Sequence, residues 1–186
     1  MNDDIGGQTV RLALRKATAP VHERLHEAAP FAALAEGRLT LDNYAGLLGT
    51  LGAYYFAASE HVPIDPARLA ALRSDMAAVG ATPDAPPRLA APPSAAARLG
   101  WRYVVDGSIF GGRVIHRQLD YLFGAAEDGR RFFRGSPGAA AGWQRLCARL
   151  ERAGQAPGAL EAMIAGAAEA FAAFERLIGQ AETVDA

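Results

Sequence analysis

Hydrophobic residues recur along most of this chain with the spacing of a helix. Between residues 40 and 60, for example, Tyr44, Leu47, Leu48, Leu51 and Tyr55 are three or four positions apart and would form one apolar stripe. No segment alternates apolar and polar residues as a half-buried strand does, and no Asn-Gly pair indicates a hairpin. The pattern therefore predicts an all-α fold, a compact bundle of about seven helices.

Capping residues and prolines give the expected helix boundaries. Thr40 and Ser94 can cap helices that follow them, because their hydroxyl oxygens accept hydrogen bonds from the first turn. Pro20 interrupts the first helical pattern, so we expect a kink or a restart there, with Thr18 as a new cap. The other expected segments are helices over 9–29, 66–79, 139–153 and 158–179, a Pro-rich loop over 80–93 and a disordered tail over 1–7, all within a single domain of residues 1–186.

Glycines interrupt two of these helical patterns at regular intervals. Gly46, Gly49 and Gly52 recur every three residues, and Gly107 and Gly111 stand four apart on one face. Each glycine in a helix costs about 1 kcal/mol relative to alanine. We expect that another segment, or a flat ligand, approaches the backbone closely at these faces.

Composition and charge exclude several classes of function. The chain has 19 Lys and Arg against 20 Asp and Glu, so a net charge of −1 gives no overall attraction to nucleic acid or to anionic membranes. The densest basic cluster, residues 130–134, is expected to be a solvated turn. Cys147 is the one cysteine, which allows no internal disulfide and fits a reducing compartment. With no signal-peptide pattern and no apolar run of membrane-spanning length, we expect a soluble cytoplasmic protein.

The segment HERLH, residues 22–26, allows several kinds of chemistry. It fits H-E-x-x-H, in which His22 and His26 would share a zinc ion with Glu23 as general base. The metzincin continuation is missing, because alanines occupy positions 29 and 32. The same letters contain E-x-x-H, half of a di-iron site, but the chain has no second E-x-x-H. Two readings remain: ordinary helix residues, or a single histidine that binds a haem iron axially.

Three stretches resemble the biliverdin-producing haem oxygenases of bacteria. LRKATAPVHERLH (14–26) is similar to the family's segment around the proximal histidine, and YVVDGSIFGGRVI (103–115) to its glycine-bearing distal helix. RFFRGSPGAAAGWQRLCARLE (131–151) resembles, more weakly, the segment before the penultimate helix. The order and spacing of the three stretches also match, so the resemblance covers most of the chain.

The resemblance implies a haem-degrading enzyme and assigns roles to individual residues. His22 would be the proximal iron ligand, and the distal helix would carry Gly107, Ser108, Gly111 and Gly112. Haem would be both cofactor and substrate, cleaved with O₂ to biliverdin, CO and Fe²⁺, with electrons from an external reductase or ferredoxin. A neutral histidine ligand, unlike a thiolate, gives little push toward O–O cleavage. Candidate partners of the haem edge and its propionates are Arg15, Lys16, Tyr103, Arg145 and Arg149.

One departure from the family bears on activity. Some members, notably the animal type, carry an aspartate on the distal helix where this chain has Ser108, and Asp106 lies on a different face of the helix. A non-catalytic haem-binding or haem-sensing protein on the same fold is therefore the alternative, and a helical interaction domain without haem is a third reading. Nothing in the sequence requires more than a monomer.

Overall fold

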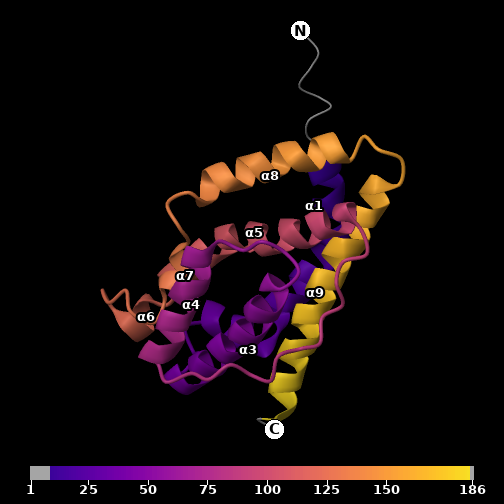
Figure 1. Cartoon of the computed structure of the whole chain (residues 1–186). Coiled ribbons are helices and arrows are strands. Elements are labelled where there is room, and N and C mark those ends of the chain that lie inside the picture. The colour runs from indigo at the N-terminus through magenta and orange to yellow at the C-terminus, as the bar shows by residue number, and fades with distance from the viewer. Residues whose placement is uncertain (1–8, 185–186) are drawn as a thin grey trace.

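The computed structural model describes residues 9–184, so the predicted tail of residues 1–7 lies outside the described residues. This part of the chain is all-helical, without a strand (Figure 1). It contains nine helices: α1 (Thr9–Glu27), α2 (Ala29–Ala35), α3 (Leu41–Ser59), α4 (Pro66–Ala78), α5 (Ala95–Gln118), α6 (Asp120–Phe123), α7 (Arg131–Arg134), α8 (Ala139–Ala153) and α9 (Ala159–Val184).

The predicted all-α class is confirmed, and the number of helices exceeds the expected seven for a simple reason. The helices α6 and α7 are four residues long, too short to show a helical period in the sequence. The chain also breaks at Ala28, and Pro30 lies at the start of the short helix α2. Proline fits there because the first turn of a helix needs no intrahelical N–H bond.

Side-chain caps begin three of the long helices. The Thr40 hydroxyl accepts from the Asn43 amide at 3.2 Å, and the Ser94 hydroxyl accepts from the Ala97 amide at 3.0 Å, as predicted. Asp65 caps α4 in the same way. The helices therefore begin where local chemistry satisfies their free amides.

The first helix contradicts the predicted restart at Pro20. It runs as one element from residue 9 to residue 27 across the proline. Thr18 is buried and caps nothing, because its hydroxyl donates back to the Leu14 carbonyl at 2.9 Å. The predicted restart is wrong because α1 packs along α9, and this tertiary contact outweighs the local cost of the proline.

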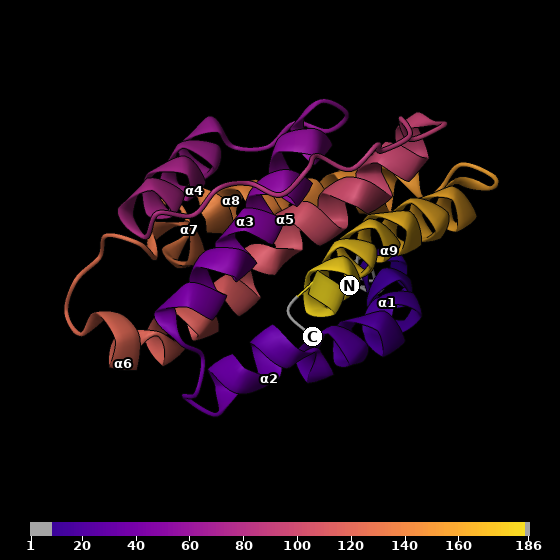
Figure 2. The same ribbon diagram turned by 90° about the horizontal axis from the view of Figure 1, so that it is seen from below.

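The centre of the bundle is the crossing of α5 and α9, and α9 also contacts α1 and α3 (Figure 2). Two glycines permit the close crossing. A Cβ at Gly100 would overlap the Met163 carbonyl of α9, and one at Gly166 would overlap the Ala97 carbonyl of α5. The two backbones are thus in direct contact, which fixes α5 relative to α9.

The glycines of α3 meet the prediction in part. A Cβ at Gly49 would lie 2.5 Å from the Thr82 carbonyl oxygen, and one at Gly52 would lie 2.8 Å from the Met76 sulfur. Gly46 has no neighbour within 4 Å of such a Cβ. Residues 81–93 contain no helix or strand and cross α3 at this close approach.

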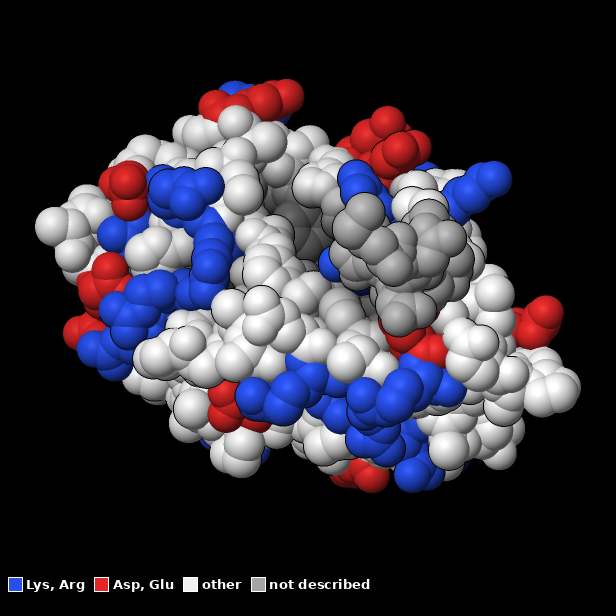
Figure 3. Space-filling model, turned by 90° about the horizontal axis from the view of Figure 1, so that it is seen from above, with Lys and Arg blue, Asp and Glu red and all other residues white. Residues whose placement is uncertain are grey.

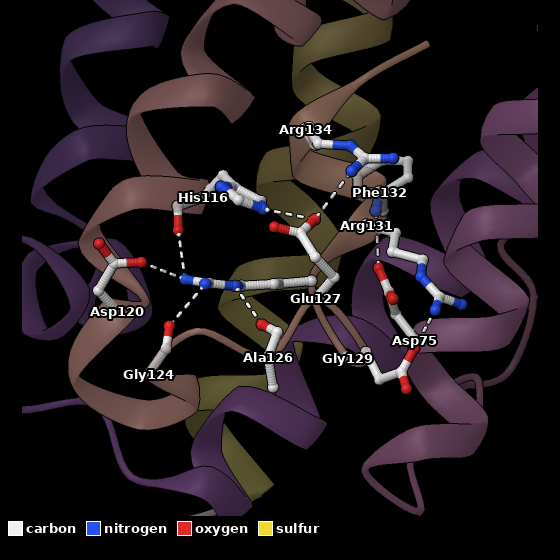
Figure 4. Close-up of polar contacts among 12 residues, drawn as sticks. Asp75, His116, Asp120, Gly124, Ala126, Glu127, Gly129, Arg131, Phe132 and Arg134 are labelled. Carbon is white, nitrogen blue, oxygen red and sulfur yellow. Dashed lines mark hydrogen bonds and ion pairs between the residues drawn. The ribbon is translucent and has the colours of Figure 1, made fainter.

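The basic cluster over 130–134 is solvated only in part: Arg131 and Arg134 are exposed, as the sequence suggested, whereas Arg130 is buried. Arg130 is only 3% exposed and donates to the carbonyls of His116, Gly124 and Ala126 and to the Asp120 carboxylate (Figure 4). The guanidinium thus closes the carbonyl end of α5 and holds α6 beneath it. Four acceptors therefore compensate the burial of the Arg130 guanidinium.

A buried carboxylate holds α7 in place. Asp75 of α4 is fully buried and accepts the Phe132 amide at 2.7 Å (Figure 4). Burial raises its pKa, and backbone bonds from Phe132, Arg131 and Gly129 oppose the rise. This anchor determines where Phe132 and Phe133 project into the interior. None of the helices in the described part of the chain has the length and apolarity of a membrane span.

Candidate functional site

A cavity of about 720 Å³ lies inside the bundle, within the range of pockets that hold small ligands and cofactors. Its wall is mostly apolar and aromatic, and a few polar groups converge in it. The residues that line it are Arg15, Thr18, Ala19, His22, Glu23, Leu25, His26, Phe31, Leu34, Ala35, Leu51, Tyr54, Tyr55, Arg68, Tyr103, Val104, Val105, Gly107, Ser108, Gly111, Gly112, Val114, Ile115, Gln118, Phe132, Phe133, Trp143, Phe171 and Phe174.

One wall of the cavity carries both histidines of the HERLH segment. The rings of His22 and His26, one turn apart on α1, stand 4.6 Å apart edge to face. The ring of Phe171 on α9 lies 6.3 Å from His22 on another side. Burial, and secondly His26, lower the pKa of His22, while Glu23 opposes the shift. His22 is therefore neutral at pH 7, the form in which imidazole binds a metal.

Another wall is formed by the glycine-bearing stretch of α5. A Cβ at Gly111 would meet nothing within 4 Å, so this glycine faces open space. One at Gly107 would touch the Trp143 ring at 3.3 Å, and one at Gly112 would lie 2.9 Å from the Phe133 carbonyl oxygen. The missing side chain makes room for something different at each glycine: for the α7 backbone at Gly112, for the Trp143 ring at Gly107, and for cavity space at Gly111.

The anchor of α1 lies on α8. Glu151 is buried, and its carboxylate accepts the backbone amides of Val10 and Arg11, both at 3.0 Å. A carboxylate at a helix N-terminus satisfies free amides and complements the helix dipole. The contact fixes the position of α1 along the bundle and so the depth at which His22 enters the cavity.

The structure gathers some of the predicted site residues and leaves others apart. His22, Gly107, Ser108, Gly111 and Gly112 line the same cavity, although 84 positions separate the first from the second in the sequence. Two of the predicted haem-edge residues, Arg15 and Tyr103, line it as well.

The remaining predicted cations lie elsewhere. Lys16 on α1 and Arg145 and Arg149 on α8 are exposed and are not among the residues that line the cavity. The face that carries α8 is shown in Figure 3, where Lys and Arg side chains gather in two stretches. The sequence does not determine which side of its helix each cation takes, because that depends on how the helix packs.

Sequence reasoning missed a polar cluster in the wall. Arg68 of α4 is 4% exposed, and its Nη2 donates to the Tyr55 hydroxyl and to the Ser108 hydroxyl, both at 2.9 Å. The two hydroxyl oxygens lie 2.7 Å apart. A signal was present, since Arg68 shares a face with Leu72 and Met76 at a spacing of four, which puts an arginine in an apolar stripe.

The cavity fits a flat aromatic macrocycle that carries a metal. It offers a neutral imidazole on one element, a helix face without side chains at Gly111 on another, and an apolar aromatic lining between them. Among the described residues, no group of three His, Cys, Asp or Glu side chains could hold a metal ion.

Comparison with curated proteins finds similarity to a protein named "Heme oxygenase" from Xanthomonas campestris pv. campestris (strain 8004). The two chains are 40% identical over 110 residues, which cover 58% of this chain and 64% of that protein. The match thus spans less than two thirds of the relative's length. No family model matches the chain. The chain is thus similar to a protein named as a haem oxygenase over 110 residues, and its all-helical fold agrees with that similarity.

Proposed function

We propose that this protein is a haem oxygenase, which binds haem in the cavity and cleaves it with O₂ to biliverdin, CO and Fe²⁺. The observation that carries the proposal is a shared cavity, which His22 of α1 and the residues Gly107, Ser108, Gly111 and Gly112 of α5 line from different walls. When bound, the haem supplies the iron that activates O₂ and the macrocycle that is cleaved. Electrons come from an external reductase or ferredoxin.

The residues of the chain bind and orient the haem. His22 provides the iron ligand, and its lowered pKa keeps its ring nitrogen free of a competing proton at pH 7. The rings of His26 and Phe171 both lie edge to face with the imidazole and limit the space in which it can rotate. Arg15 at the wall supplies a cation for a propionate.

On the other face, α5 determines how much space remains beside the iron. Gly111 leaves room for a small ligand, while Trp143 against Gly107 and Phe133 against Gly112 close the cavity around it. The wall is largely apolar, which strengthens the polar contacts made against it. This confinement selects which edge of the macrocycle lies next to the reacting site.

The alternative proposal is a haem-binding protein without turnover. It is favoured by the state of Ser108, whose hydroxyl donates to the Val105 carbonyl at 2.8 Å and accepts from Arg68. That arrangement leaves the serine with less capacity to serve a ligand than a free carboxylate would have.

Turnover separates the two proposals. The haem-loaded protein is reduced under anaerobic conditions, and O₂ is then added with an electron donor. An oxygenase loses the Soret band and produces biliverdin and CO in equal amounts. A stable oxygenated spectrum, with no CO released, would support the binding protein.

A further inference from the structure

Arg68 is a buried cation in the cavity wall that lacks a counterion. It lies in the first turn of α4 and is 4% exposed. Among the described residues Arg68 forms no ion pair. Burial raises the pKa of Asp106 and the positive charge of Arg68 opposes that rise, but the Asp106 carboxylate pairs with Arg102 instead, at 2.9 Å. Its Nε atom is buried without a hydrogen-bond acceptor. An unpaired buried charge is costly, so such a residue needs a reason to be there.

The guanidinium is held rigidly on several sides. Its Nη1 donates to the Val105 carbonyl of α5 at 2.6 Å. Its carbon lies 4.6 Å from the ring centre of Tyr55 and 4.6 Å from that of Phe132. Two aromatic faces and a carbonyl stabilise the cation in part. They leave its charge directed at the part of the wall where Ser108 lies.

Arg68 also controls the two hydroxyl groups beside it. Arginine is a donor only and stays charged, so the oxygens of Tyr55 and Ser108 both accept from it. The hydroxyl protons must then point elsewhere. The Val105 carbonyl accepts one of them, which leaves the other for the neighbouring hydroxyl or for a ligand in the cavity.

We propose that Arg68 makes this wall a site for anionic or electron-rich small ligands of the haem iron, through its own charge and through the hydroxyls of Tyr55 and Ser108. The inference rests on the proposed haem binding. Arg68 acts as a positioning residue that orients a hydroxyl proton toward the ligand.

The test uses the haem-loaded protein with cyanide and CO as probes. Arg68→Met removes the positive charge but keeps an unbranched side chain. Arg68→Lys keeps the positive charge but lacks the planar guanidinium, whose N–H groups donate to Tyr55 and Ser108 together. Arg73→Met is the matched control, because Arg73 is on the same helix, exposed and outside the cavity wall. The measurements are the cyanide affinity of the ferric protein and the C–O stretching frequency of the ferrous CO complex.

Arg68→Met is expected to weaken cyanide binding at least about tenfold, since the positive charge and the charged hydrogen bonds that orient the two hydroxyl groups are lost. The C–O stretching frequency should rise, because a nearby positive charge lowers it. Arg68→Lys should fall between wild type and Arg68→Met, and Arg73→Met should match wild type. If Arg68→Met does not fold, the C–O stretching frequency of Arg68→Lys, compared with wild type, tests the role of Arg68.

The outcomes separate this inference from the proposed function. Normal cyanide affinity and an unshifted frequency in both Arg68 variants, with intact hemin binding, would overturn the role of Arg68 and leave haem binding standing. Failure of the wild type to bind hemin would overturn both.

Discussion

Two adjacent glycines of α5 should respond in opposite ways to the same substitution. A Cβ at Gly111 enters open space, whereas a Cβ at Gly112 would approach the Phe133 carbonyl oxygen to 2.9 Å and the Phe133 Cα to 3.4 Å. Both residues are inside a helix, so alanine gains about 1 kcal/mol of helix propensity at either position. The difference between the variants therefore reports the packing alone.

The magnitudes follow from these contacts. Gly111→Ala should raise the free energy of unfolding by up to about 1 kcal/mol, a gain of roughly 2–4 °C in Tm for a chain of this size. Gly112→Ala should lower it by up to about 2 kcal/mol, since overpacking costs about 1–3 kcal/mol before the helix gain of about 1 kcal/mol is subtracted. Thermal and urea unfolding of the apoprotein measure both.

A larger side chain at Gly111 tests the cavity itself. Gly111→Leu should fold with near wild-type stability and yet bind hemin about tenfold to 150-fold more weakly, because the leucine occupies space that the haem needs. Hemin affinity is measured by absorbance titration. The reasoning would be refuted if Gly111→Ala destabilised the fold as much as Gly112→Ala, or if Gly111→Leu bound hemin as tightly as wild type.

Three further predictions concern the supports of the site. Glu151→Ala should destabilise the apoprotein by about 1–2 kcal/mol through loss of the cap on α1, with Glu151→Gln in between; equal Tm values would contradict that role. Asp75→Ala should cost about 1–3 kcal/mol because the Phe132 amide loses its buried acceptor, as urea unfolding would measure. If His22 binds the iron, protons compete with the iron for its ring nitrogen. Because the pKa of His22 is lowered, hemin affinity should be level above pH 6.5 and fall only at lower pH. A fall in affinity that begins above pH 7 in a titration series would argue against His22 as the ligand.

The sequence predicted the elements that local chemistry determines. Thr40 and Ser94 cap the helices expected of them, because the residue that caps a helix is adjacent to it in the chain. At Pro20 the restart of the helix that was one expectation does not occur, since packing of α1 on α9 outweighs the local cost of the proline. The four-residue helices α6 and α7 exist through bonds to Arg130 and Asp75, which the local sequence does not reveal.

The same distinction holds for the candidate site: residues in recognisable sequence segments could be predicted, and residues positioned by tertiary packing could not. His22 and the glycines of α5 could be identified because each belongs to a recognisable segment, and the fold brings them to one cavity. Arg68 belongs to no such segment, and its role depends on the approach of α4 to α5. Arg145 and Arg149 of α8 are exposed and do not line the cavity, so their predicted contact with the haem propionates stays a prediction.

The measurement that tests the central claim most directly is a hemin titration of wild type, His22→Ala and His61→Ala, followed at the Soret band. His61 is the control, because its ring bonds to the Leu89 carbonyl at 3.0 Å and does not line the cavity. A saturable one-to-one shift in wild type and His61→Ala, altered or weakened in His22→Ala, is the predicted result. A His22→Ala spectrum and affinity identical to wild type would contradict the assignment of His22 as the haem ligand.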